Sequence, residues 1–446
     1  MYLERAPTVE ELFERLEIDE VLAALKAPAD PRAVARYPHW DKLRHLEPPP
    51  DLSTEQWWLR IKGGRENDAR PLPLTDAAGK ACGYGLLDSM LRQLRYIDQR
   101  CGGEVAMDEV VTSEKKAGRR FLVNSLMEEA IRSSQLEGAT TSRRAAKELL
   151  RTGREPRDRS ERMIANNYAA LQFMREEMGE KLSPGGILDL HRILTEGTLD
   201  DPSAAGRLQR PDEPRVAVFD RDDGRPIHRP PPADQLPERM QMLCDFANEN
   251  EDNEPFIHPV VRAILLHFWL AYDHPFEDGN GRTARILFFW LMRVRGYWLA
   301  EYLPISRFIR KAPARYARAF VETETDGGDV TYFLIHQLDV IQKAIDDLHL
   351  YLQRKTAEVR DIEMLLRDAA YLNGRQLALL TDAVRNPDSS YSFDSHAKSH
   401  RVSHETARTD LHGLERRGLL VKRRAGKQHR FEPAPNLPNR LKESPT

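Results

Sequence analysis

The stretch "HPFEDGNGRTAR", residues 274–285, places glycine, asparagine, carboxylates, histidine and arginine between two apolar runs. The run before it, "VVRAILLHFWLAYD" (260–273), predicts a buried helix that ends at Pro275, because proline disfavours helical geometry at the residue before it. The run after it, "RTARILFFWLMRV" (282–294), predicts a second buried helix. We therefore expect a loop between two core helices that ends at a helix N-terminus, where free N–H groups and the dipole favour an anion.

The glycines and arginines of this loop predict a phosphate site. Gly279 and Gly281 permit positive φ and a close approach of the backbone, as an anion-binding nest requires. Arg282 and Arg285 lie on one face of the first helical turn, where a cation opposes the helix dipole. Their position is explained if an anion binds between them.

Three other polar residues supply the remaining groups that phosphoryl transfer needs. His274 can accept a proton near neutral pH, Asp278 offers hard oxygen ligands for Mg²⁺, and Asn280 can orient a phosphate. Each has a simpler alternative as a helix cap or a turn residue. A calcium loop is excluded because its acidic spacing is absent, and a Walker A loop because no Gly-Lys-Ser/Thr sequence follows.

Residues 274–285 resemble the signature of the Fic family, HxFx[DE]GNGRxxR, and match it at every fixed position. The resemblance extends over about residues 120–355, including the expected hairpin "RVAVFDRDDGRPIHRPPP" (215–232) and the long helix at 331–355. It implies a mainly α fold, a Fic-type helical core with a β-hairpin flap. It also implies a protein adenylyltransferase that moves AMP from ATP, with Mg²⁺, to a Ser, Thr or Tyr hydroxyl of another protein or of itself.

The resemblance assigns a role to each residue of the motif. His274 would deprotonate the target hydroxyl, which attacks the α-phosphorus, and Asp278 would bind Mg²⁺. Arg285 would bind the γ-phosphate, and the α- and β-phosphates would be held by Gly279, Asn280, Gly281 and Arg282. The hairpin 215–232 would dock the target segment by strand pairing. A donor nucleotide other than ATP stays open.

A second motif, "SSQLEG" (133–138), ends a predicted helix at 121–138. Alone, this motif is typical of a helix C-terminus that is capped by Gly138. Beside the Fic motif, Ser133, Glu137 and Gly138 resemble the family's inhibitory helix, [ST]xxxE[GN]. This implies that Glu137 pairs with Arg285 and excludes the γ-phosphate, within one chain or across a homodimer. In some relatives the same glutamate supports AMP removal, so a de-AMPylating hydrolase is an alternative.

The C-terminal part predicts a winged helix-turn-helix at 362–435. Ser403 and Gly418 are expected to cap its third helix, and "LLVKRRAGKQHRFEP" (419–433) alternates as a two-stranded wing does. Residues 395–430 carry ten Lys/Arg against three Asp/Glu, whereas the whole chain has a net charge of −3, so a polyanion such as DNA is the expected partner. The candidate DNA contacts are His404, Thr406 and Arg408 in the groove and Arg423, Arg424 and Lys427 on the wing. The alternative is a winged helix that binds protein.

The remaining expectations concern organisation and location. We expect residues 1–117 to be an N-terminal helical region of unknown role, 118–355 the catalytic domain and 436–446 a mobile tail. No apolar run reaches the length of a membrane span, and the three cysteines show no CxxC spacing, so a cytoplasmic protein is predicted. The alternative function is a DNA-binding transcription regulator or antitoxin-like protein whose Fic core only senses nucleotide.

Overall fold

The computed structural model describes residues 3–102, 115–216, 218–219, 226–250, 252, 254–367, 372–385, 389–425 and 428–443. The chain divides into two compact units, one made of residues 1–106 and 119–346 and the other of 107–118 and 347–446. Both are mainly helical, and the described strands form three two-stranded sheets. No helix within the described ranges is long and apolar enough to cross a membrane.

The first unit begins with five short helices and a hairpin. The helices pack around a core that includes Trp40, Trp57 and Trp58, and their bounds are α1 Val9–Arg15, α2 Ile18–Lys26, α3 Pro31–Arg36, α4 Trp40–Leu43 and α5 Thr54–Asp68. Strands β1 (Arg70–Thr75) and β2 (Ala81–Tyr84) pair antiparallel before α6 (Asp88–Cys101). We expected only helices here, so the hairpin is a correction. Its turn is closed by Asp76, whose Oδ1 accepts hydrogen bonds from the N–H groups of Ala78 and Lys80 at 2.9 and 2.8 Å.

The N-terminal helices and hairpin are attached to the rest of the unit by backbone and charge contacts. Gly83 exchanges backbone hydrogen bonds with the segment 328–330, donating to Gly328 O at 3.1 Å and accepting from Val330 N at 2.8 Å. The buried Lys62 ammonium pairs with Asp326 at 2.8 Å. Residues 3–102 and the helices that follow are therefore one packed body, although the sequence predicted a boundary at 117.

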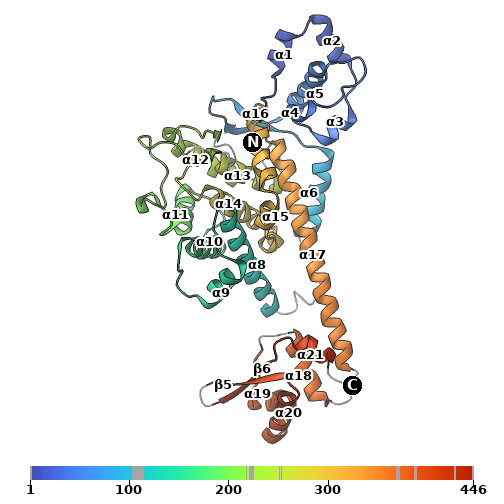
Figure 1. Cartoon of the computed structure of the whole chain (residues 1–446), viewed down its shortest axis with the longest axis vertical. Helices are drawn as coiled ribbons and strands as arrows, with labels where there is room; N and C mark the ends of the chain where they lie inside the picture. Colours follow the sequence, from blue (N-terminus) through green and yellow to red (C-terminus); the bar gives the residue numbers. More distant parts are fainter. Residues whose placement is uncertain are drawn as a thin grey trace. The chain divides into compact units, whose positions relative to one another are not determined.

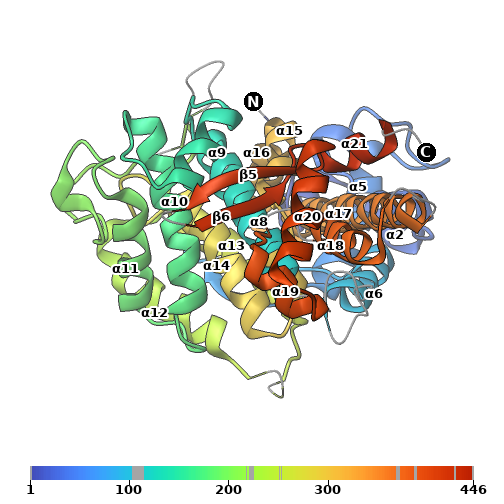
Figure 2. The ribbon, with the colours of Figure 1, turned by 90° about the horizontal axis from the view of Figure 1, so that it is seen from below.

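Two apolar helices form the centre of the first unit. Helices α13 (Pro259–Asp273) and α14 (Asn280–Val294) lie side by side and are buried almost throughout, which confirms the predicted pair of core helices. Figure 1 shows them surrounded by α8 (Lys115–Leu136), α10 (Arg159–Glu176), α11 (Pro184–Thr195) and α12 (Leu236–Asn248). In Figure 2, α10 lies between α11 and α9 (Arg143–Thr152). The remaining helices are α15 Ile305–Lys311, α16 Pro313–Thr325 and α17 Thr331–Arg367, with 3₁₀ turns at Pro202–Ala204, Ala233–Gln235 and Trp298–Tyr302.

The expected flap is present as a short antiparallel pair, β3 (Val218–Phe219) and β4 (Pro226–His228). Residues 217 and 220–225 of the predicted hairpin lie outside the described residues. Arg215 fixes the base of the flap, because its Nε donates to Pro231 O at 2.8 Å and its Nη2 donates to Asp273 O at 2.7 Å. The flap is thereby joined to the C-terminal end of α13.

The second unit has three helices and a hairpin in the predicted order. They are α18 Gly374–Arg385, α19 Phe393–His400, α20 His404–Arg416, β5 Leu420–Ala425 and β6 Gln428–Pro433. The Ser403 hydroxyl caps α20 as predicted, by accepting a hydrogen bond from Thr406 N at 3.1 Å. The predicted mobile tail is wrong for residues 437–443, which form α21 (Leu437–Glu443). Leu437 and Leu441 are buried in the core of this unit, and that burial holds the helix.

Candidate active site

The loop 274–279 has a fixed conformation between the two core helices. His274 ends α13 in a left-handed conformation with φ of 45°, and Gly279 begins α14 with φ of 84°. The Asn280 side chain closes the loop, since its Oδ1 accepts from Phe276 N at 2.9 Å and its Nδ2 donates to Phe276 O at 2.8 Å. We expected this amide to hold a phosphate. The amide is buried and bonded to the loop backbone, next to the completely buried Phe276 ring, and its role toward a phosphate stays a prediction.

His274 is half-buried and is oriented by the same asparagine. Asn280 Nδ2 lies 3.2 Å from His274 Nδ1, and an amide nitrogen can only donate, so Nδ1 is the acceptor. The neutral imidazole therefore carries its hydrogen on Nε2. Because Nε2 is already protonated in this arrangement, it can accept a proton only after the contact between Asn280 and Nδ1 is broken. Burial, together with the neighbouring His228 and Arg215, lowers the pKa of His274 to about 4. The side chain is therefore neutral at pH 7, as a general base must be.

Arg282 points into the protein from the first turn of α14. Its side chain is completely buried, with Nη2 3.2 Å from Asp278 Oδ2 and Nη1 donating to Leu194 O at 3.3 Å. Its buried Nε has no hydrogen-bond partner among the described residues. A buried guanidinium with an unused N–H group is costly unless a further acceptor binds there, so this position fits an anionic ligand.

Arg285, one turn further along α14, binds the end of α8. Its Nη2 lies 2.8 Å from Glu137 Oε1, and its Nε donates to Ser133 Oγ at 2.9 Å, so the expected pair is present. Gly138 follows with φ of 101°, a conformation that favours glycine. A β-carbon on Gly281 would overlap Glu137 Oε1 and lie 3.0 Å from Arg285 Nη1. The carboxylate of Glu137 therefore lies against the backbone at the N-terminus of α14, where an anionic ligand would bind.

Comparison with known proteins places this loop in a family. Residues 181–292 match the family model "Fic/DOC family", and this range includes α11 to α14 and the whole loop. The chain contains a Fic domain. The solved Fic family protein from Desulfovibrio desulfuricans shares its fold, with a TM-score of 0.50 at 19% identity, over 82% of this chain and 98% of that one.

Named relatives are similar to the chain over parts of their length. A protein called protein adenylyltransferase Fic from Drosophila mojavensis is 26% identical over 369 residues, which are 81% of this chain and 66% of the relative. A protein of the same name from Nematostella vectensis is 31% identical over 121 residues, 26% of this chain and 25% of the relative. The chain thus covers less than two thirds of the length of these relatives.

Buried polar contacts hold α8 against α10 and α15. The Glu129 carboxylate accepts hydrogen bonds from Ser306 N, at 3.0 Å, and from the Ser306 hydroxyl. Asn167 Nδ2 donates to Ala130 O at 3.1 Å, and the Ser134 hydroxyl donates to Met163 O at 3.2 Å. Burial raises the pKa of Glu129, although the Ser306 hydrogen bonds oppose the rise. The sequence analysis missed these anchors, because each joins α8 to a distant segment.

His191 is a further residue of the site that sequence reasoning missed. Its ring stacks on Phe276 with centroids 3.8 Å apart and planes at 8°. Its Nε2 donates to Asp278 O at 2.9 Å, and its Nδ1 accepts from Gly206 N at 3.0 Å. Burial lowers its pKa to about 4, so the neutral ring keeps both hydrogen bonds at pH 7. His191 supports the loop 274–279 from α11, and no sequence spacing indicates this contact.

Asp278 is the residue of the Fic domain best placed to bind Mg²⁺. Its side chain is 38% exposed, with Oδ1 accepting from Gly279 N at 2.6 Å and Oδ2 near Arg282. Within the described ranges, no group of three or more His, Cys, Asp or Glu side chains is arranged to hold a metal. One partly exposed carboxylate still fits Mg²⁺, which usually keeps several waters and shares its other ligands with substrate phosphates.

The predicted DNA contacts lie in the second unit, outside the Fic domain. His404 is 60% exposed and lies 3.4 Å from Asp394, whereas the Thr406 hydroxyl lies 2.9 Å from Ser403 Oγ in the helix cap. Arg408 is exposed on α20, and it forms no ion pair with any described residue. On the hairpin, Arg423 pairs with Glu432 at 2.7 Å; the side chain of Arg424 and all of Lys427 lie outside the described residues.

Proposed function

We propose that the chain is a protein adenylyltransferase that transfers AMP from ATP to a Ser, Thr or Tyr hydroxyl of a protein, including its own chain. The observation that carries this proposal is the convergence of a neutral His274 with two buried arginines, Arg282 and Arg285, on one loop and helix start. The names of the curated relatives support the same activity.

In this reaction the residues of the loop position the reactants and balance charge. His274 takes the proton of the target hydroxyl as its oxygen bonds to the α-phosphorus of ATP, and pyrophosphate leaves from the opposite side. The orphan Nε of Arg282 and the N–H groups of Gly279 and Gly281 hold the α- and β-phosphates. Asp278 would hold Mg²⁺, which supplies positive charge to the phosphates when bound.

Glu137 keeps this activity low by binding Arg285. While the carboxylate pairs with the guanidinium at 2.8 Å, a γ-phosphate meets both a negative charge and an occupied space. ATP is then held away from the position for in-line attack. An alternative follows from the same geometry: Glu137, which is 31% exposed, could orient water and make the domain a de-AMPylating hydrolase.

The flap is the proposed docking site of the target protein. Strands β3 and β4 project beside the catalytic loop, and their base is fixed by Arg215 and by His228, whose Nε2 donates to Tyr272 O at 2.6 Å. An extended target segment would add to an edge of this pair by backbone hydrogen bonds. That arrangement would bring a hydroxyl toward His274.

Labelling with α-phosphate-labelled ATP and Mg²⁺ tests this function. The Glu137→Gly chain should label itself, and the additional change His274→Ala should abolish labelling while ATP still binds. Repeating the assay with the other three nucleotides identifies the donor. Labelling that persists at an equal rate without His274 would refute its role as the base, and labelled product that disappears only with Glu137 present would favour the hydrolase.

For the second unit we propose a DNA-binding winged helix, supported by its three helices followed by an antiparallel hairpin and by the basic charge of 395–430. The alternatives are a protein-binding winged helix and, for the whole chain, a transcription regulator or antitoxin-like protein. DNA affinity should fall steeply with salt and should weaken when the exposed Arg408 is replaced by alanine. Affinity that is constant from low to high salt would contradict phosphate contacts. The cytoplasmic location and the homodimer stay predictions.

A further inference from the structure

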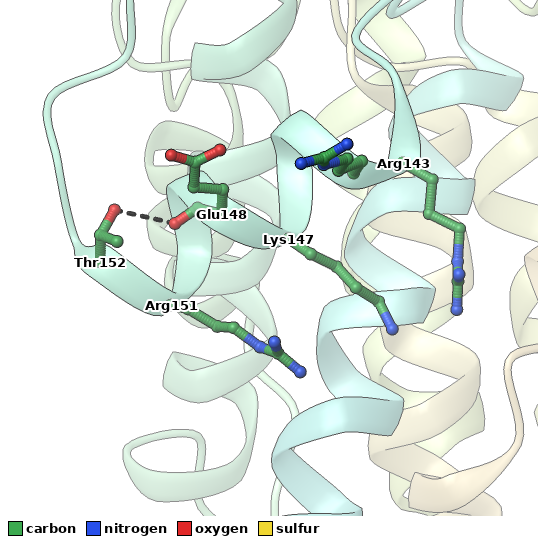
Figure 3. A pocket seen from close by; sticks show the side chains of 6 residues that line it. Arg143, Lys147, Glu148, Arg151 and Thr152 are labelled. Atoms are coloured by element: carbon green, nitrogen blue, oxygen red, sulfur yellow. Dashed lines mark hydrogen bonds between the residues drawn. The ribbon is translucent and has the colours of Figure 1, made fainter. Parts of the chain in front are cut away.

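A cavity outside the active site is lined mainly by cations. Its volume is about 540 Å³, and its walls come from one helix, α9: Arg143, Arg144, Lys147, Glu148, Arg151 and Thr152. Figure 3 shows Arg143, Lys147 and Arg151 extending from the helix toward the same side, with Glu148 pointing away from them. Like charges four residues apart on a helix repel each other, as do Arg143 with Lys147 and Lys147 with Arg151. The spacing is unfavourable unless an anion lies among these side chains.

Part of this cationic face already binds an anionic group of the protein. Glu128 of α8 lies 2.6 Å from Lys147 Nζ, and it accepts from Arg143 Nε at 2.7 and 3.1 Å. Burial opposes ionisation of Glu128, but the hydrogen bonds from Arg143 and Lys147 lower its pKa. Glu128, which also lies 3.8 Å from Arg132 of its own helix, and Glu148 in the cavity wall leave the four cations of this face in excess.

Two cations of the same cavity have no such partner. Arg144 and Arg151 are exposed, and neither forms an ion pair or a hydrogen bond through its guanidinium with any described residue. Arg154, just beyond α9, is by contrast paired with Glu161 at 2.6 Å. Two cations of the cavity thus keep their charge unpaired.

We propose that the α9 cavity binds a compact polyphosphate, and that the bound ligand loosens α8. Arg144 and Arg151 would bind its phosphates first, and Arg143 and Lys147 would exchange Glu128 for phosphate oxygens. The consequence for catalysis rests on the proposed function, because α8 carries Glu137. With its contact to α9 lost, α8 would release Glu137 from Arg285 more often.

The dimensions favour a compact ligand over a nucleic acid. Arg143 and Arg151 are eight residues apart on α9, roughly 12 Å at the rise of an α-helix, which matches a chain of two or three phosphates. The site is an open hollow whose described walls come from α9 alone. A nucleic acid would need cations along a longer surface, whereas these four belong to a single short helix.

Binding is tested with inorganic tripolyphosphate on the full chain, by calorimetry and without nucleotide. The Arg144→Ala/Arg151→Ala chain should bind at least about tenfold more weakly, because two charge-assisted contacts are lost. Arg144→Lys/Arg151→Lys should keep most of the affinity, and Arg92→Ala, an exposed arginine of α6, should keep all of it. Sodium chloride at equal ionic strength serves as the control for simple screening.

Unchanged affinity in the double alanine chain would overturn the site, and so would displacement by sodium chloride alone. Tighter binding of an oligonucleotide, with the same loss in the double alanine chain, would overturn the compact ligand. Tripolyphosphate should also speed hydrogen exchange of the α8 amides at residues 124–136, and unchanged exchange with binding retained would refute the coupling. None of these measurements needs transferase activity, so they succeed or fail independently of the proposed function.

Discussion

Two glutamates at the end and the middle of α8 meet cations in opposite ways. Glu137 is 31% exposed and binds a buried arginine, Arg285, whose side chain is 3% exposed. Glu128 is 16% exposed and binds an exposed arginine, Arg143, whose side chain is 52% exposed. In the first pair the cation is fixed and the carboxylate can leave, whereas in the second the carboxylate is covered and the cation can turn to solvent.

The two contacts also lie on opposite sides of the α8 segment. Nine residues separate Glu128 from Glu137, about two and a half helical turns, so their side chains point in opposite directions. The segment is held between α14 on one side and α9 on the other. The buried contact should therefore control the active site directly, and the exposed contact should adjust how firmly α8 stays in place.

Removing the carboxylate of Glu137 and, separately, that of Glu128 should show the largest difference between the two contacts. Glu137→Gly should raise self-labelling by roughly 10- to 100-fold, because a charge-assisted contact of about 1.5–3 kcal/mol no longer competes with ATP. Glu137→Gln should give an intermediate rise, and Glu128→Gln a rise below about threefold. Self-labelling at fixed ATP measures all three, with Glu238→Gln of α12 as the exposed control. Equal labelling of the wild type and Glu137→Gly would end the autoinhibition hypothesis.

Double-mutant cycles should show a smaller difference, between the coupling free energies of the two ion pairs. The coupling free energy of Glu137 with Arg285 should be about 1.5–3 kcal/mol, since the guanidinium is buried. That of Glu128 with Arg143 should be about 0.2–1 kcal/mol, as for exposed pairs. Chemical denaturation of the four chains in each cycle gives both values. Equal couplings would mean that exposure does not distinguish the two contacts.

Added salt should affect hydrogen exchange differently at the two contacts. Between 0.05 and 0.5 M sodium chloride, hydrogen exchange near Glu128 should rise, because ions screen its partly exposed cations. Exchange around Ser133 should change little, since Arg285 is buried and also bound to that serine. Hydrogen exchange by mass spectrometry resolves the two segments. A larger salt response around Ser133 would reverse the assignment of the fixed and the adjustable contact.

The smallest expected effect is that of pH on His274, the proposed base. The pKa of His274 is lowered to about 4 by burial, with help from His228 and Arg215, so the neutral form persists as pH falls from 7.5 to 5. Labelling by the Glu137→Gly chain should stay nearly constant over this range and decline only near pH 4. A rise centred near pH 6.5 would show a solvated, ordinary histidine instead.

The sequence predicted those parts of the site that depend on neighbouring residues. The end of α13, the start of α14 beside the glycines and the positive φ of Gly279 follow from proline, glycine and apolar periodicity in neighbouring residues. The pair of Glu137 with Arg285 came from the family resemblance, because their separation of 148 residues leaves no local signal.

The sequence did not predict contacts whose partners are chosen by tertiary packing. His191 meets Asp278 across 87 residues, and nothing around either residue indicates the other. The hydrogen bonds of the Asn280 amide to the backbone of Phe276 were likewise not predicted, because a sequence does not tell whether an amide also bonds its own loop. The error at 437–443 was avoidable, since Leu437 and Leu441 share a helix face and could have indicated α21.

Gly281 has a consequence for how the proposed activity could change by mutation. Even a methyl group there would collide with the carboxylate of Glu137 in its position beside Arg285, so the carboxylate would have to shift. In Gly281→Ala, the added methyl group would displace the Glu137 carboxylate. The same methyl group would obstruct a phosphate that bound in place of the carboxylate. Under the proposed function, a substitution at Gly281 should therefore affect inhibition and phosphate binding together, and variants that lose only the inhibition should carry changes at Glu137 or in α8.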